Sequence, residues 1–266
     1  MHIVDRGHGV PLVLIPGIQG RWEYLGRTVD ALARSFRVIT FPLLGERTSG
    51  RRGGQAELDD LADQVTAALD SRGMDRAVIC GISFGGLVGL RFAARQPDRT
   101  AALVLVSTPG PDFHLSSRHL MYARAPWLFG PFFLAETPRR LREELRIAFP
   151  RIADRARFGW RQVRTLFTAP LSLTAMAARA MLIGSSNPGE DCARIAAPTL
   201  IVTGEPSLDR VVRADSTRAY LPLIRGARGI EMAGTGHVGY LTQPDRFVTA
   251  IREFLTSVDA VKHDAA

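Results

Sequence analysis

Three polar residues of this 266-residue chain could together form a nucleophilic site. In chain order they are Ser83, Asp209 and His237, and each stands in a loop that follows an apolar run typical of a buried strand. A serine hydroxyl is a poor nucleophile near pH 7 until a neutral imidazole takes its proton. The imidazole in turn needs a carboxylate to fix its tautomer and stabilise its cation. These residue types therefore predict acyl-transfer chemistry if the fold brings them together.

Ser83 lies at the centre of a Gly-x-Ser-x-Gly pattern. The apolar residues 77–80 lead into it and a helical pattern leads out of it, which predicts a strand, a very tight turn and a helix. A serine on so sharp a turn has a strained backbone. The residues two before and two after it must be almost free of side chain to avoid collision, and Gly81 and Gly85 meet that requirement.

Short continuous apolar runs alternate with helical patterns along most of the chain. The predicted strands cover residues 2–4, 11–15, 36–41, 77–81, 100–106, 198–204 and 229–232. The predicted helices cover residues 22–35, 55–72, 87–96 and 214–223, followed by a last amphipathic helix. This pattern indicates an α/β fold with a parallel sheet covered on both faces. The loops after its strands would emerge at one edge, where residues distant in sequence can converge.

The strand pattern disappears between residues 110 and 197. This segment holds half of the chain's 20 aromatic residues and several arginine-rich helical stretches. We interpret it as a helical insertion over the sheet, and the alternative that its aromatics form a small core of their own stays open. The predicted division is an α/β core of residues 1–109 and 198–258, a helical segment of residues 110–197 and a flexible C-terminal tail of residues 259–266.

Composition argues against nucleic-acid and membrane partners. The net charge is +8, but 33 of the 34 basic residues are arginines scattered through every segment, without a recognisable nucleic-acid module. The N-terminus has no apolar leader, and apolar runs such as residues 101–106 are too short to span a bilayer. We therefore expect a cytoplasmic protein whose partner is a small-molecule substrate. The sequence leaves its oligomeric state open.

Nothing in the sequence predicts a metal or a cofactor. Cys80 and Cys192 show no metal or redox spacing and are expected to be free thiols, and His114 and His119 have no acid nearby at ligand spacing. Residues 234–239 match the pattern G-x-G-x-x-G, but too little chain follows for the βαβ unit that a dinucleotide site requires.

Over residues 2–257 the chain resembles the α/β-hydrolase family. The matching segments are residues 14–20, 81–86, 199–205, 209–212 and 236–237. The resemblance implies the α/β-hydrolase fold: a mostly parallel central sheet flanked by helices, with residues 110–197 as a helical cap. It also implies these roles: Ser83 as nucleophile, His237 as general base and then acid, Asp209 as orienting carboxylate, and the backbone amides of Ile18 and Phe84 as oxyanion hole.

Two positions depart from the family's pattern. Many relatives have His-Gly where this chain has Pro16-Gly17, which leaves the placement of the Ile18 loop open. The acid usually falls three residues after the strand-ending glycine, whereas Asp209 arrives two residues later. Glu205 and Asp112 therefore stay as alternatives for the acid.

The expected function is that of a serine hydrolase acting through an acyl-enzyme on a small, apolar carboxylic ester or related acyl substrate. A carbon–carbon bond hydrolase, an acyltransferase, a lyase or a cofactor-free perhydrolase could use the same three residues, and the fold could also serve a non-catalytic binder of small ligands. Epoxide and haloalkane hydrolysis are disfavoured, because relatives with those activities carry aspartate where this chain has Ser83.

Overall fold

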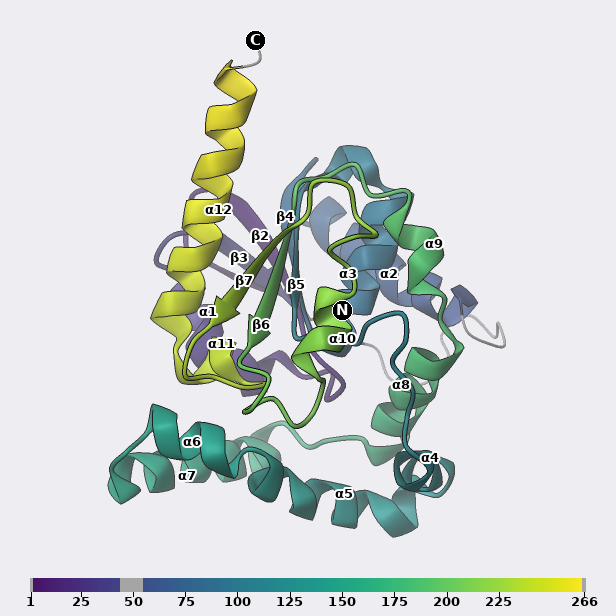
Figure 1. Cartoon of the computed structure of the whole chain (residues 1–266), viewed down its shortest axis with the longest axis vertical. Helices are drawn as coiled ribbons and strands as arrows, with labels where there is room; N and C mark the ends of the chain where they lie inside the picture. Colours follow the sequence, from purple (N-terminus) through teal and green to yellow (C-terminus); the bar gives the residue numbers. More distant parts are fainter. Residues whose placement is uncertain (1, 44–54, 265–266) are drawn as a thin grey trace.

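A seven-stranded sheet forms the centre of the computed structural model, which describes residues 2–43 and 55–264 (Figure 1). The strands are β1 (Val4–Arg6), β2 (Pro11–Ile15), β3 (Arg37–Thr40), β4 (Ala77–Ile82), β5 (Thr100–Val106), β6 (Thr199–Gly204) and β7 (Arg228–Met232). Their order is β1-β3-β2-β4-β5-β6-β7, with β1 antiparallel to β3 and all other pairs parallel. The predicted α/β fold with a mostly parallel sheet is confirmed.

Alternate residues of each central strand serve two separate cores. In β2, Val13 and Ile15 pack into one core, whereas Leu12 and Leu14 pack into the other. Every residue of β4 and of β6 is buried. Strands covered on both faces need apolar residues at every position, which is why they appear in the sequence as continuous apolar runs.

Helices cover both faces of the sheet (Figure 1). On one face lie the short 3₁₀ helix η1 (Trp22–Leu25), α1 (Gly26–Leu32), α11 (Gly239–Thr242) and α12 (Pro244–Asp264). On the other lie α2 (Gln55–Asp70), α3 (Phe84–Arg95), the 3₁₀ helix η2 (Pro97–Arg99) after it, and α10 (Ala214–Arg218). The helix predicted over residues 214–223 ends earlier, at Arg218. Pro222 explains this, since it lacks an amide donor and disfavours helix at the residue before it.

Six helices fill the segment between β5 and β6, every residue of which the structure describes. They are α4 (Ser117–Arg124), α5 (Pro126–Arg140), α6 (Arg142–Ala148), α7 (Ile152–Thr168), α8 (Leu173–Ser185) and α9 (Pro188–Cys192). Figure 1 shows α4 to α7 as a layer across the end of the sheet to which the arrowheads of β6 and β7 point, while α8 and α9 lead back towards α3. We call residues 110–197 the cap.

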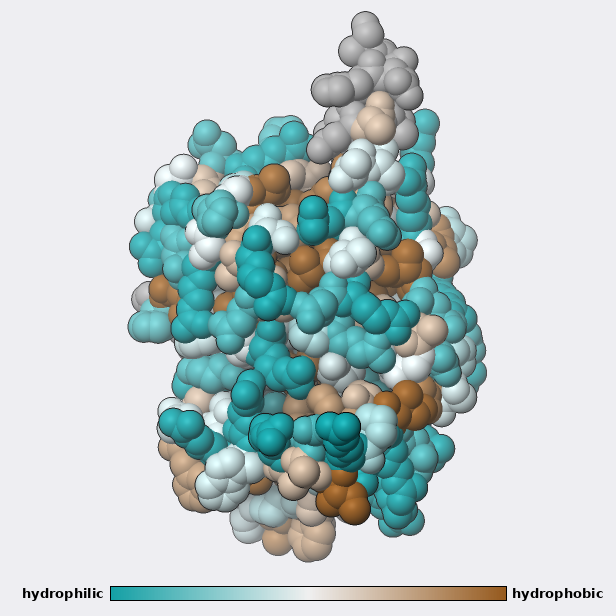
Figure 2. Space-filling model, turned by 90° about the vertical axis from the view of Figure 1, so that its left-hand side faces the viewer, coloured by the Kyte–Doolittle hydropathy of each residue, from teal (hydrophilic) through white to brown (hydrophobic). Residues whose placement is uncertain are grey.

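The aromatic residues of the cap fall into two groups. Tyr122 stacks on Phe129 and meets Phe133 edge to face, so one group forms a small core between α4 and α5. A second group is exposed, including Trp127 at 75% and Phe167 at 83%. Figure 2 shows the side of the molecule nearest α12, where apolar side chains gather at the lower end formed by the cap. The first group fits the alternative of a small separate core, and the exposed group belongs to neither arrangement.

Three further features concern the chain as a whole. Helix α12 continues to Asp264, so the flexible tail predicted from residue 259 starts as helix, because residues 259–264 contain no glycine or proline to end it. Cys80 and Cys192 are both buried and free. Within the described ranges no single helix is long and apolar enough to cross a membrane, and α7 with α8 meets that test only as a pair bent by 106°.

Candidate active site

Ser83 occupies a sharp elbow between β4 and α3. Its backbone has φ 52° and ψ −120°, a left-handed conformation that is strained for a residue with a side chain. Two hydrogen bonds hold this conformation: the Ser83 amide donates to the Val106 carbonyl at 2.7 Å, and the Ser83 carbonyl accepts from the Gly86 amide at 2.8 Å. The elbow thus presents the serine at the carboxyl end of β4.

The glycines on either side of the elbow leave no room for side chains. A Cβ atom on Gly81 would lie 2.3 Å from the Gly85 carbonyl oxygen, and a Cβ atom on Gly85 would lie 2.5 Å from the Pro16 carbonyl oxygen. Both distances are far inside van der Waals contact. The steric requirement inferred from the Gly-x-Ser-x-Gly pattern is therefore present in the fold.

Asp209 and His237 form a buried pair. His237 Nδ1 lies 3.3 Å from Asp209 Oδ2, and the two residues are 9% and 4% exposed. The other carboxylate oxygen, Asp209 Oδ1, accepts hydrogen bonds from the amides of Val211 and Val212, each at 3.0 Å. Burial by itself would raise the pKa of Asp209, but the charge of His237 and these hydrogen bonds hold that pKa below its ordinary value.

The two alternative acids lie elsewhere. Glu205 uses its Oε1 atom to accept a hydrogen bond from the Gly234 amide at 2.6 Å, which fixes the start of the histidine loop. Asp112 is exposed in the loop after β5. Between β6 and Asp209 the chain forms a turn in which the Asp209 amide donates to the Glu205 carbonyl at 3.0 Å. This turn accommodates the two additional residues and places Asp209 beside His237.

Close backbone approach joins the loops that carry the acid and the histidine. A Cβ atom on Gly236 would lie 2.6 Å from the carbonyl oxygen of Leu208 and 2.8 Å from Glu144 Oε2. Only glycine fits between these two neighbours. Because Gly236 has no side chain, its backbone can lie against that of Leu208, which brings the loops of His237 and Asp209 together.

The loop after β2 runs alongside the elbow. A Cβ atom on Gly17 would lie 3.5 Å from Ser83 Cβ. The next residue, the half-buried Ile18, therefore follows directly after a backbone position beside the serine. Phe84 is the first residue of α3, and the amide of a first helical residue has no partner inside its helix. These are the two amides expected to form an oxyanion hole.

Arg179 of α8 anchors this loop from the cap. Its guanidinium donates to the carbonyl of Ile18 and to the carbonyl of Leu43, each at 3.0 Å, and it packs against Gly20. Burial lowers the pKa of Arg179 to about 10, so the side chain stays charged at neutral pH. A cationic side chain is therefore buried directly behind the Ile18 peptide.

The Ser83 hydroxyl forms no hydrogen bond to any residue that the structure describes. Catalytic serine–histidine contacts are often long without ligand and tighten in the complex with substrate. The structure thus brings Asp209 and His237 into contact and places Ser83 separately on the elbow after β4.

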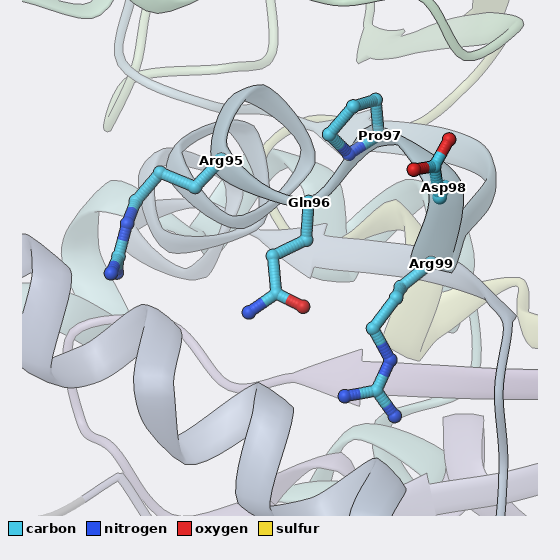
Figure 3. A pocket seen from close by; sticks show the side chains of 5 residues that line it. All are labelled: Arg95, Gln96, Pro97, Asp98 and Arg99. Atoms are coloured by element: carbon cyan, nitrogen blue, oxygen red, sulfur yellow. The ribbon is translucent and has the colours of Figure 1, made fainter.

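Two cap residues near these loops, Glu144 and Arg179, were missed by sequence reasoning. Neither belongs to a motif. Glu144 lies between the exposed Arg142 and Arg146 of α6, so only its burial in the fold separates it from its neighbours. Arg179 is the one charged residue of the apolar helix α8, and that isolation is the signal that could have found it. A shallow pocket of about 300 Å³ lies far from all of these residues, at the end of α3 opposite Ser83 (Figure 3). It is lined by Arg95, Gln96, Pro97, Asp98 and Arg99.

Comparison with known proteins identifies the class. The model of the alpha/beta hydrolase family matches residues 12–250, so this chain belongs to that family and is a hydrolase. It is 27% identical over 256 residues to the pyrrolizixenacetamide deacetylase of Xenorhabdus hominickii, covering 95% of this chain and 93% of the relative. It is also 27% identical over 265 residues to the pimeloyl-[acyl-carrier protein] methyl ester esterase of Nitrosomonas europaea, covering 94% and 97%.

Solved structures share the fold. The enol-lactonase from Burkholderia xenovorans superposes with a TM-score of 0.75 at 24% identity, covering 96% of both chains. The predicted resemblance is thereby confirmed at the level of family and architecture.

Proposed function

We propose that this protein is a serine hydrolase that cleaves a small carboxylic ester or related acyl substrate through an acyl-enzyme. The observation that carries the proposal is the buried Asp209–His237 pair, on the loops that follow β6 and β7, at the same end of the parallel sheet as the Ser83 elbow after β4. The elbow supplies a half-buried serine hydroxyl on a strained turn. The names of the two relatives, a deacetylase and a methyl ester esterase, agree with acyl transfer to water.

The first half of the proposed reaction forms the acyl-enzyme. Ser83 Oγ attacks the carbonyl carbon while His237 Nε2 takes the hydroxyl proton. The resulting oxyanion accepts hydrogen bonds from the amides of Ile18 and Phe84, and the positive N-terminal end of α3 favours its charge. When the carbon–oxygen bond breaks, His237 returns the proton to the leaving alcohol and the acyl group stays on Ser83.

The second half regenerates the enzyme. Water attacks the acyl carbon, His237 takes the water proton and then returns it to Ser83 Oγ as the carboxylic acid leaves. Asp209 acts in both halves. Its lowered pKa keeps it ionised at neutral pH, so it favours the tautomer with the proton on Nδ1 and stabilises the imidazolium.

The cap is the source of substrate selection in this proposal. Its helices α4 to α7 lie across the carboxyl ends of the strands (Figure 1). They carry exposed aromatic side chains, Trp127 and Phe167 among them. Apolar surface of this kind favours a modest-sized apolar acyl or alcohol group. The cap therefore directs the search for substrates towards small apolar esters.

A covalent probe tests the proposal directly. The purified chain is treated with a fluorophosphonate probe and assayed with short p-nitrophenyl esters. We expect labelling and turnover in the wild type, and loss of both in Ser83→Ala and His237→Ala. Ser71→Ala is the matched control, since Ser71 is an exposed serine at the end of α2. Full labelling of Ser83→Ala, or a wild type inert to the probe and to all esters, would contradict a nucleophilic Ser83 and favour a non-catalytic binder.

A further inference from the structure

One carboxylate of the cap is buried against the loop that carries His237. Glu144 belongs to α6 and has no solvent exposure, although the helix is otherwise largely exposed. Its neighbour Glu143 lies at the surface and forms an ion pair with Arg146. Two adjacent glutamates of one helix thus have opposite environments.

Glu144 contacts the backbone on both sides of the histidine. Its Oε2 atom accepts a hydrogen bond from the Val238 amide at 3.2 Å, and the Gly236 amide also stabilises the ionised carboxylate. The approach is possible because Gly236 has no side chain: a Cβ atom there would lie 2.8 Å from Glu144 Oε2. The Glu144 carboxylate therefore lies against the residue before His237 and the residue after it.

The charge of Glu144 also reaches the acid–base pair. Burial is the largest influence and raises the pKa of Glu144, while the two amides and the charge of His237 lower it and the charge of Asp209 raises it. Tyr240 is the other titratable group facing this carboxylate, and burial together with both carboxylates raises the pKa of Tyr240. An ionised Glu144 places a second negative charge, beside that of Asp209, within reach of the His237 imidazole.

A role limited to packing does not explain this arrangement well. Burying a carboxylate is costly unless it is fully hydrogen-bonded, and Glu144 Oε1 has no hydrogen-bond partner among the described residues. An apolar side chain would attach α6 to the sheet without that cost. The carboxylate does what an apolar side chain cannot, because it accepts from the two amides and places a negative charge near His237.

We propose that Glu144 is a positioning residue for His237: it holds the histidine loop through the amides of Gly236 and Val238 and makes the cap part of the general-base machinery. The inference rests on the proposed function, because it assigns a task that exists only if His237 activates Ser83. It adds a second carboxylate, contributed by the insertion, to the acid supplied by the α/β core.

Two substitutions separate the hydrogen bonds from the charge. Glu144→Gln keeps an oxygen that can accept from both amides but removes the charge, whereas Glu144→Ala removes both. Glu143→Gln is the matched control, one residue away on the surface of α6. For each variant, kcat and KM for a p-nitrophenyl ester and the rate of fluorophosphonate labelling are measured from about pH 5 to pH 9, together with the thermal melting temperature.

We expect Glu144→Gln to move the acid limb of the kcat/KM profile to lower pH by about half a unit or more, because loss of a nearby negative charge disfavours the imidazolium. We expect Glu144→Ala to lower kcat by about 10- to 100-fold through misplacement of His237, with a smaller change in KM. The Glu143→Gln profile should match the wild type.

Unchanged kcat, KM and labelling rates in a folded Glu144→Ala would overturn the inference and leave Glu144 as an anchor of the cap. If Glu144→Ala does not fold, the pH profile of Glu144→Gln decides: a shifted acid limb supports the inference and an unchanged one overturns it. A wild type that reacts with neither probe nor ester would overturn the proposed function and this inference with it. If the wild type reacts and both Glu144 variants keep its kinetics and labelling rates, the inference fails but the proposed function stands.

Discussion

Replacing Asp209 by asparagine should disable His237 by reversing its tautomer. Asp209 Oδ1 accepts from the amides of Val211 and Val212, each at 3.0 Å. In Asp209→Asn the only side-chain acceptor is the amide oxygen, so these two donors hold it in the place of Oδ1. The NH₂ group then points at His237 Nδ1 and donates to it. His237 must accept at Nδ1 and carry its proton on Nε2, where a general base needs a free lone pair.

The size of the effect follows from the step that is lost. A substitution that fixes the wrong tautomer of a catalytic histidine costs on the order of 10⁴-fold in kcat, or about 5.4 kcal/mol of transition-state stabilisation. The fold should survive, because the asparagine is isosteric and keeps both amide hydrogen bonds. KM should change far less than kcat, since no substrate contact is removed.

The assay combines kinetics with spectroscopy. Ester turnover and fluorophosphonate labelling are compared among the wild type, Asp209→Asn and Glu205→Gln, and ¹⁵N NMR of the His237 imidazole reports its tautomer. Glu205→Gln is the control, because glutamine can still accept from Gly234 and this side chain does not contact His237. Turnover by Asp209→Asn within tenfold of wild type, or severe loss in Glu205→Gln, would refute the assignment of the acid.

Four further outcomes are expected. Arg179→Met should leave the carbonyls of Ile18 and Leu43 unpaired, costing about 2–6 kcal/mol of unfolding free energy in urea and slowing turnover, and a variant equal to wild type in both would contradict its role as an anchor. Gly85→Ala should destabilise by about 1–3 kcal/mol or fail to fold, as judged by denaturant midpoint, because its Cβ meets backbone at 2.5 Å. Cys80 should resist iodoacetamide in the folded protein and react once unfolded, since burial raises its pKa; rapid labelling of the native chain would count against the burial. The lowered pKa of Asp209 should stabilise the fold at pH values above the unfolded-state pKa of about 3.9, and this stabilisation should be lost as the pH falls through the folded-state pKa. In Asp209→Asn the free energy of unfolding should therefore fall less on acidification than in the wild type.

The sequence was most informative where function depends on local backbone chemistry. The elbow could be predicted because a serine in that conformation requires Gly81 and Gly85, and both stand at the required spacing. Asp209 could be proposed despite its unusual spacing, and the turn that starts at Glu205 explains how it reaches His237. The strands were evident because burial on both faces imposes continuous apolar runs.

Tertiary contacts explain what the sequence could not reveal. Glu144 and Arg179 act through long-range contacts. The buried Met176 and Leu182, three residues before and after Arg179, place it on the inner face of α8, but only the fold shows which carbonyls it meets. Helix α10 ends at Arg218, because Pro222 disfavours helix before it while the apolar spacing continues beyond it. The helical end of α12 was missed because a polar C-terminal segment can extend a helix that is already anchored in the core.

The anchoring of two loops by the cap has a consequence for protein engineering. Arg179 donates to the segment after β2, and Glu144 accepts from the segment after β7, so the cap contacts loops on both sides of the candidate site. A chimaera in which residues 110–197 are replaced by the cap of a relative, or by a short linker, would lose the contacts of Arg179 and Glu144 together. Substrate range in this scaffold is therefore better altered by single changes on the inner face of the helices than by wholesale exchange.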